Sequence, residues 1–295
     1  MTSKGISELD KNERDRAREL HEKAIFVNQI DSTNTERWGK EYYDKLMKAG
    51  VTLDNSGIGG PNLRRTIDSQ LSRIKALNSI GMDKMVIALK SDDVLRAKKE
   101  GKLAVFWGTQ DGRPTERDER LLEHLYKMGL RVFGLCYNVR NYIADGLNEI
   151  TDAGLSAFGY KVIEKCNELG ILIDLSHVEQ QPSLDAIEAS RDPVIFSHSN
   201  AMGVYKHRRN IYDDQIKAIE EKNGVIGVTA FGMTIKQLKS NEDKPHLEDM
   251  LDHLDYHVNM IGVRGAIADW AKDALRHKEE VEQMMYRDFT FNAAE

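Results

Sequence analysis

The sequence has few cysteines, no long apolar run and no block of basic residues, and each absence excludes a class of protein. Only 2 cysteines occur in 295 residues, which argues against a disulfide framework, so Cys136 and Cys166 are expected to be buried thiols of a reducing compartment. No apolar stretch approaches the roughly 18 residues of a membrane-spanning helix, and the N-terminus is too polar for a signal peptide. We therefore expect a cytoplasmic protein without a membrane contact.

The charge is mildly acidic and evenly spread. Lysine and arginine number 42 against 48 aspartates and glutamates, a net charge of −6. Without a basic block, a nucleic-acid partner is a poor expectation. The length suits one α/β barrel, and no low-complexity linker divides the chain. We therefore predict a single domain over residues 1–295.

Short apolar runs alternate with amphipathic segments along the whole chain. Repeated strand–helix alternation is typical of parallel strands, and no Gly-rich dinucleotide motif follows the first strand. The pattern therefore predicts an α/β fold of the (β/α)8 TIM-barrel type. The expected strands are 24–30, 51–53, 103–107, 132–136, 171–175, 194–196, 225–229 and 265–268, with 85–89 outside the barrel or at its rim. The expected helices are 8–23, 42–49, 63–79, 91–101, 116–128, 155–169, 179–190, 213–221 and 247–260.

The two ends of the chain are expected to cover the barrel. Residues 1–23 would supply a solvated helix packed on one end, since charges alternate there with apolar residues at helical spacing. Residues 271–295 would supply a closing helix and a tail. The glycines and proline after residue 53, in DNSGIGGP, predict a loop.

The most informative stretch holds two similar strand ends. Ile171–Leu175 is followed by Ser176-His177, and Val194–Phe196 by Ser197-His198. Neighbouring parallel strands lie about 4.8 Å apart, so both imidazoles could face one point at the carboxyl ends of the strands. Two histidines are the minimum that would hold zinc with help from carboxylates or water, and they also suit acid–base chemistry. Either histidine alone is equally compatible with a satisfied, partly buried residue.

The motifs in this region resemble the renal (membrane) dipeptidase family of metallopeptidases, peptidase family M19. The segments that carry the resemblance are DLSHV, PVIFSHSNA and HRRN, together with GLCYN, NYIADG and NGVIGVTAFG. The resemblance implies a metallo-dependent-hydrolase barrel with two metal ions, often assembled as a homodimer. It also implies that His177 and His198 hold the second metal, that Arg209 binds the substrate carboxylate, and that Asp269 handles the substrate amine or a proton.

The chain departs from the family at the first metal. Where the family has D-x-H-x-D after its first strand, this sequence has Asn28–Ser32, with Ile30 at the histidine position. The bridging glutamate is matched by Gln110, and the substrate-contacting histidine by Tyr137. An amide carries no negative charge to offset a metal pair. The E-G-G-H stretch of the family is here Gln110-Asp111-Gly112-Arg113, which adds Arg113 to the substrate-binding candidates Arg209, Tyr137 and Gln110.

These residues predict a divergent hydrolase acting on a dipeptide or on a small amide or amino-acid-derived carboxylate. Its cofactor would be zinc, at most one ion, held by His177 and His198, which together with Asp269 are the catalytic candidates. Two alternatives stay open. One is a catalytically silent barrel that binds a ligand, and the other is a metal-independent lyase or isomerase that uses the histidine pair.

Overall fold

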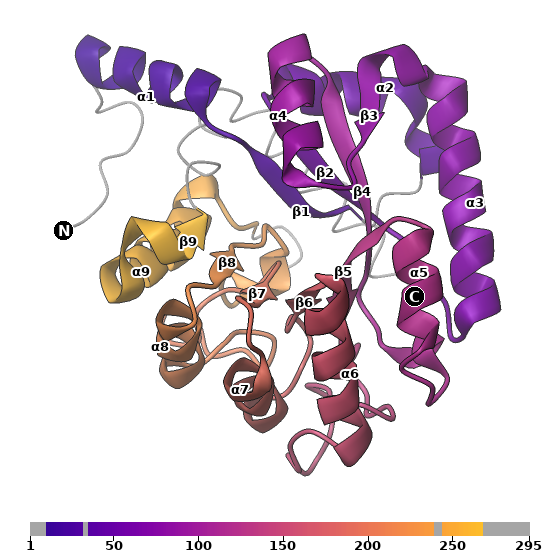
Figure 1. The fold of residues 1–295 in the computed structure, drawn as a ribbon. Coiled ribbons are helices and arrows are strands. Elements are labelled where there is room, and N and C mark those ends of the chain that lie inside the picture. Colours follow the sequence, from indigo (N-terminus) through magenta and orange to yellow (C-terminus); the bar gives the residue numbers. More distant parts are fainter. Residues whose placement is uncertain (1–9, 32–34, 239–243, 268–295) are drawn as a thin grey trace. The chain divides into compact units, whose positions relative to one another are not determined.

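The computed structural model describes residues 10–31, 35–238 and 244–267, and the chain forms two compact units. The larger unit spans Ile25–Ser197, and the smaller one joins Met1–Ala24 to His198–Glu295. Both are drawn in Figure 1, and each is described by itself. The expectation of a single domain therefore stays a prediction.

The larger unit is built on parallel strands that follow one another in chain order. The paired order is β1-β2-β4-β5-β6-β7, and β3 pairs only with β4. This confirms the placement of the 85–89 run beside the main order of strands. Their bounds are β1 Val27–Asp31, β2 Leu53–Gly57, β3 Met85–Ile87, β4 Leu103–Thr109, β5 Leu130–Gly134, β6 Leu172–Asp174 and β7 Ile195–Phe196.

The expectation for β2 was wrong in one respect. The segment predicted to open a loop at residue 54 continues as strand through Gly57 and pairs in register with β4, Asp54 opposite Val105 and Ser56 opposite Trp107. Polar residues seldom fill the middle of a buried strand, yet Asp54, Asn55 and Ser56 are at most 1% exposed. Ladder hydrogen bonds to the neighbouring strands hold the segment extended despite its composition.

Helices follow the strands of this unit, and several carry clear start and stop signals. Ser156 caps α6 by accepting the Gly159 N–H at 2.9 Å, and Gly170 ends it at φ 71°. Ala97 of a helix packs with Ala88 and Ala104 of the sheet region in one buried apolar cluster. The helices are α2 Thr35–Lys48, α3 Leu63–Ile80, α4 Ser91–Glu100, α5 Leu121–Lys127, α6 Ala157–Leu169 and α7 Gln180–Ala189, with short η2 Met82–Lys84 and η3 Arg113–Thr115.

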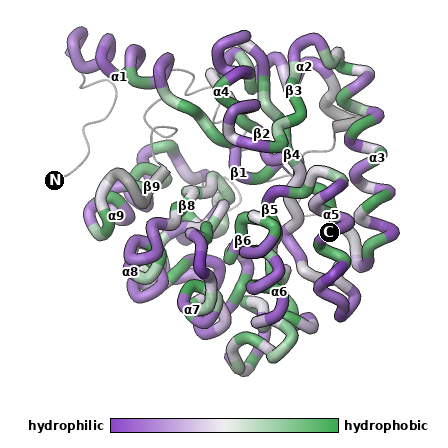
Figure 2. Tube along the Cα trace, in the orientation of Figure 1, coloured by the Kyte–Doolittle hydropathy of each residue, from purple (hydrophilic) through white to green (hydrophobic). Residues whose placement is uncertain are grey.

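The smaller unit contains a parallel pair of strands and three helices among its described residues. Strands β8 (Val225–Gly227) and β9 (Ala266–Ile267) pair with Ile226 opposite Ala266. Helix α9 (Leu247–Gly265) packs against both strands and against α8 (Asp213–Glu221), and η4 spans Gly232–Thr234. Helix α1 (Lys11–Lys23) begins with a capping box between Asp10 and Glu13, and Figure 2 draws most of it as hydrophilic.

Candidate functional site

A buried carboxylate ties the ends of β6 and β7 together in the larger unit. Asp174, 1% exposed, accepts the backbone N–H groups of Ser176 and Ser197, each at 3.0 Å. The Ser197 hydroxyl donates to its other oxygen at 2.5 Å, and the Ser176 and Ser197 hydroxyls lie 3.2 Å apart. Asp174 therefore has a structural role, because it fixes Ser176 and Ser197 at the carboxyl ends of β6 and β7.

His177 is held in one orientation by residues that follow β5. Its Nδ1 lies 2.7 Å from Asn138 Oδ1, and the Tyr137 ring lies over it at 4.2 Å between centroids. An amide oxygen only accepts, so Nδ1 is the donor in this contact. His177 and Asn138 both have positive φ, 72° and 61°. Such backbone is uncommon outside glycine and often marks a functional position.

The loop that carries Tyr137 and Asn138 is organised around Asp145, which is 3% exposed. Asp145 forms an ion pair with Arg140 and accepts the Ala153 N–H at 2.8 Å. Burial acts to raise the pKa of Asp145, but the hydrogen bonds from Arg140 and Ala153 outweigh it and lower that pKa. The carboxylate stays charged, so the loop over His177 rests on a charged, hydrogen-bonded anchor.

The segment after β4 places two predicted substrate residues. Arg113, half exposed, forms an ion pair with Asp111 at 2.5 Å, and Asp111 also accepts from Asn141 at 3.0 Å. Gly134 of β5 permits a close approach of the Gln110 backbone, since a Cβ at position 134 would lie 2.5 Å from the Gln110 carbonyl carbon. Gln110 and Arg113 therefore sit at the edge where the β4 and β5 loops meet, with Arg113 already paired.

The smaller unit holds the other strand-end histidine and the predicted carboxylate-binding arginine. Arg209, 9% exposed, donates to Ser199 Oγ at 3.0 Å and to the His198 carbonyl at 2.8 Å. Burial, helped by the nearby Arg209 charge, holds the pKa of His198 well below its usual value. His198 is therefore neutral near pH 7, which is the form that ligates metal or accepts a proton.

Three further polar residues in the smaller unit were missed from the sequence. Asn200 donates to the Thr229 carbonyl at 3.1 Å and to Thr234 Oγ1 at 3.0 Å. His253 Nδ1 accepts the Ala201 N–H at 3.0 Å, and its Nε2 lies 2.9 Å from the Ile235 carbonyl. His253 and His257 are four residues apart in α9, a spacing that puts both on one helix face. That spacing was the signal available in the sequence.

The structure tests the predicted constellation only in part. His177 lies in the larger unit, His198 and Arg209 lie in the smaller one, and Asp269 is outside the described residues. The Tyr137 ring lies against His177, and Arg209 donates to the backbone carbonyl of His198. The convergence of all of them on one point stays a prediction.

The family's first-metal positions carry neutral side chains in this chain. Within the described ranges, no group of three or more His, Cys, Asp or Glu side chains is placed to hold a metal ion. Asn138 and Tyr137 contact His177, and β1 offers Ile30 where the family pattern has histidine. A pair of divalent ions needs several anionic ligands, and neither Ile30 nor Gln110 is one.

The cysteines do not offer a nucleophile. Both are free and buried, as the sequence predicted. Burial, with the nearby Asp111 charge, raises the pKa of Cys136 to about 12, so its thiol stays protonated at neutral pH.

In the part of the chain that the structure describes, no helix has the length and apolar character needed to cross a bilayer.

Comparison with known proteins decides the family. The model for the membrane dipeptidase family, peptidase family M19, matches residues 24–268. The chain belongs to this family. Among curated members, an uncharacterized dipeptidase of Schizosaccharomyces pombe is 32% identical over 58% of this chain and 42% of its own length. Dipeptidase tcpJ of Claviceps purpurea is 28% identical over 65% of this chain and 45% of its own. The matches thus span less than half of these relatives.

Solved structures show the fold of this M19 chain. An amidohydrolase from Pseudomonas aeruginosa matches with a TM-score of 0.76 and 26% identity over 85% of this chain and 74% of its own. The probable dipeptidase PvdM from the same organism matches with a TM-score of 0.79 and 20% identity over 91% of this chain and 92% of its own. The fold class predicted from the sequence, an α/β barrel of the metallo-dependent-hydrolase type, is thereby confirmed.

Proposed function

We propose that this M19 chain hydrolyses a dipeptide, or a small amide with a free carboxylate, at a site that holds at most one metal ion. The family match over residues 24–268 supports a dipeptidase-like hydrolase. A solved metallopeptidase from Rhodobacter sphaeroides, 18% identical with a TM-score of 0.68, carries a phosphinate mimic of the dipeptide L-Ala-D-Ala. A substrate of that size and charge suits Arg209, whose planar guanidinium can receive a carboxylate through two N–H groups.

The observation that carries the proposal is the fixed imidazole of His177. The hydrogen bond to Asn138 directs the Nε2 lone pair to the other side of the ring. From that position, Nε2 holds an ion or accepts the proton of the attacking water. The water oxygen bonds to the amide carbon, the C–N bond breaks, and the leaving amine takes up a proton. Asp269 is the candidate for delivering that proton, and Tyr137, Gln110 and Arg113 border the substrate.

Zinc is the ion that the family implies, and when bound it would polarise the amide carbonyl and lower the pKa of water. In this chain, His177 and His198 are its candidate ligands. Because Ile30 and Gln110 replace ligands of the family's first metal, a bound ion would use the second site. The free thiols of Cys136 and Cys166 support a cytoplasmic location, and the family supports a homodimer as the assembly.

The test combines a metal count with a dipeptide panel. We expect at most one zinc per chain after purification without chelator, and hydrolysis of at least one dipeptide that carries a free carboxylate. His177→Ala should abolish turnover, because nothing else at the end of β6 supplies a ring nitrogen. The matched control is His124→Ala, an exposed histidine of α5, which should leave turnover unchanged.

Three outcomes would contradict the proposal. Two tightly held zinc ions per chain would overturn the reduced metal site. No turnover on the panel with or without added zinc, with ligands still raising the melting temperature, would favour a silent binding barrel. Full activity in the presence of chelators, lost in both His177→Ala and Asp269→Ala, would favour a lyase or isomerase.

A further inference from the structure

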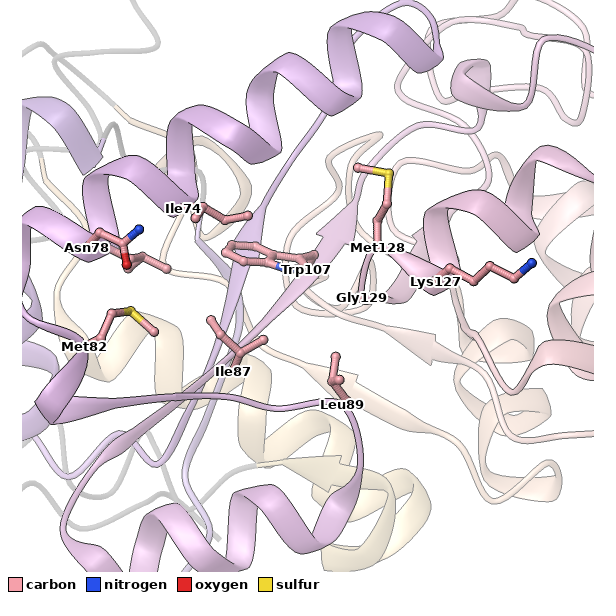
Figure 3. A pocket seen from close by; sticks show the side chains of 10 residues that line it. Ile74, Asn78, Met82, Ile87, Leu89, Trp107, Lys127, Met128 and Gly129 are labelled. Atoms are coloured by element: carbon pink, nitrogen blue, oxygen red, sulfur yellow. The ribbon is translucent and has the colours of Figure 1, made fainter.

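An apolar hollow lies beside helix α3 of the larger unit. Its volume is about 270 Å³, and its wall includes Ile74 of α3, Met82 of η2 and Met128 before β5 (Figure 3). Trp107 of β4 lies beneath it and is only 2% exposed. The indole is therefore already covered, and what the hollow offers to another molecule is its rim. Met128 precedes β5, whereas the residues that contact His177 follow that strand, so the hollow is separate from the candidate site.

Apolar side chains are exposed on and beside this rim. Leu71 is 58% exposed, Ile74 37%, Met82 38% and Leu89 48%. Leu71 lies one turn before Ile74, so the two share one face of α3. Scattered exposed apolar residues need no explanation, but four beside one hollow form a patch of the kind that marks a contact with another protein. We call these four residues the α3 face.

Helix α3 runs along this face from one end to the other. At one end, Gln70 donates to the Met128 carbonyl at 2.6 Å, which ties this part of α3 to the turn between α5 and β5. At the other end, α3 stops at Ile80, and η2 follows with Asp83 exposed to water. The ten positions from Gln70 to Ile80 span about 15 Å of helix. The face is therefore elongated, and its two ends are built by different segments.

The two ends carry opposite charges that are not paired within the molecule. Lys127 stands at the end where Gln70 meets the turn before β5, and Asp83 stands at the other. Both are exposed, and neither forms an ion pair within the described part of the chain. Glu123, one turn before Lys127, lies 3.2 Å from Lys165 instead. Figure 3 shows the Lys127 ammonium group pointing away from the hollow, so it is available to a second molecule.

We propose that the α3 face is the contact between two copies of this chain, related by a two-fold axis at right angles to α3. In this arrangement the two α3 helices run antiparallel, so each end of the face meets the opposite end of the other copy. Lys127 then faces Asp83 of the partner subunit, and Leu71 covers Met82 of the partner subunit. The inference rests on the homodimer proposed above and adds the face through which the copies meet.

The charges select this arrangement over the other two-fold contact. An axis parallel to α3 would place Lys127 opposite the same lysine of the second copy, and Asp83 opposite the same aspartate, which is repulsive at both ends. The apolar rim supplies the attraction, because removing it from water stabilises the contact in proportion to its area. An apolar centre with one charge of each sign at its ends is complementary to itself only when the helices are antiparallel.

Sedimentation velocity of the full chain over a range of concentrations, at low ionic strength, measures the dimer dissociation constant. Asp83→Lys and Lys127→Asp should each raise it by at least about tenfold, because each change occurs twice in a two-fold contact and replaces attraction by repulsion. The double variant should return to within about threefold of wild type, since the pairs re-form with exchanged signs. Asp192→Lys and Lys161→Asp, at exposed positions of the same unit, are matched controls and should change nothing.

A second pair of substitutions tests the apolar part of the face. Leu71→Gln and, separately, Met82→Gln should each weaken the dimer, whereas Ile150→Gln, at a fully exposed apolar residue of the loop after β5, should not. All three side chains are at least partly exposed, so the melting curves should match wild type. If the dimer does not dissociate on dilution, the rate of subunit exchange gives the same comparisons.

Two results would overturn the proposal. Monomers at every concentration would exclude both this face and the homodimer. A dimer that Leu71→Gln leaves unchanged, or that the exchange of charges between positions 83 and 127 does not restore, would exclude this face alone. Dipeptide hydrolysis is not part of the measurement, so its outcome is separate from that of the proposed activity.

Discussion

The fully buried histidine of α9 predicts how stability changes with pH. His257 is 0% exposed, and its ring makes no more than a weak contact with the Ser199 backbone among the described residues. Burial, together with the neighbouring His253, lowers the pKa of His257 to about 3, and the Ser199 backbone opposes this only in part. The folded state therefore excludes a proton that the unfolded chain takes up below about pH 6.5. Stability is fully present above that pH and is lost as the pH falls toward 3.

The size of the loss follows from the two pKa values. When the pH falls from about 7.5 to about 5, proton binding at this histidine stabilises the unfolded chain by about 2 kcal/mol, because pH 5 lies about 1.5 units below the unfolded pKa. The folded chain binds almost no proton there, so the free energy of unfolding falls by the same amount. Urea unfolding followed by circular dichroism at both pH values measures it. His257→Leu should remove about 2 kcal/mol of the pH-dependent loss, whereas His246→Gln, at an exposed site, should remove none. If His257→Leu loses as much stability as wild type on acidification, the titration does not occur at this ring.

Two further substitutions test other buried contacts. Burial first, and the Asp31 carboxylate second, raise the pKa of Asp54 well above its usual value, so Asp54 favours folding at low pH and its contribution is lost as the pH rises. Asp54→Asn keeps the acceptor for Asn28, which lies 2.7 Å away, and should stabilise the protein at pH 7 by about 1 kcal/mol or more; an unchanged urea midpoint would contradict this. Asn138→Gly tolerates the positive φ but loses the contact to His177, so it should lower kcat about tenfold. Asn138→Asp keeps an acceptor oxygen and should retain most activity. Equal activity in both variants would show that the amide does not position His177.

The order of the elements could be predicted from the sequence because the spacing of apolar residues and the residues that begin and end helices agree along most of the chain. Helix α8 was predicted with its observed bounds, and α3, α4, α6 and β7 within one or two residues at each end. The failure at β2 has a physical cause. Asp54, Asn55 and Ser56 have low strand propensity, and only pairing with β1 and β4 makes them strand. Tertiary pairing overrode local preference there.

Candidate site residues could be proposed from the sequence where a short motif contains them, but not where they meet a partner that is distant in the sequence. His177, His198 and Arg209 stand in recognisable segments. Asn138 contacts His177 across 39 positions of sequence, and nothing in its own neighbourhood marks it. His253 bonds to the backbone of Ala201 across 52 positions, so its role also depends on the folded arrangement. Hydrogen bonds between residues so far apart leave no periodic signal in one sequence.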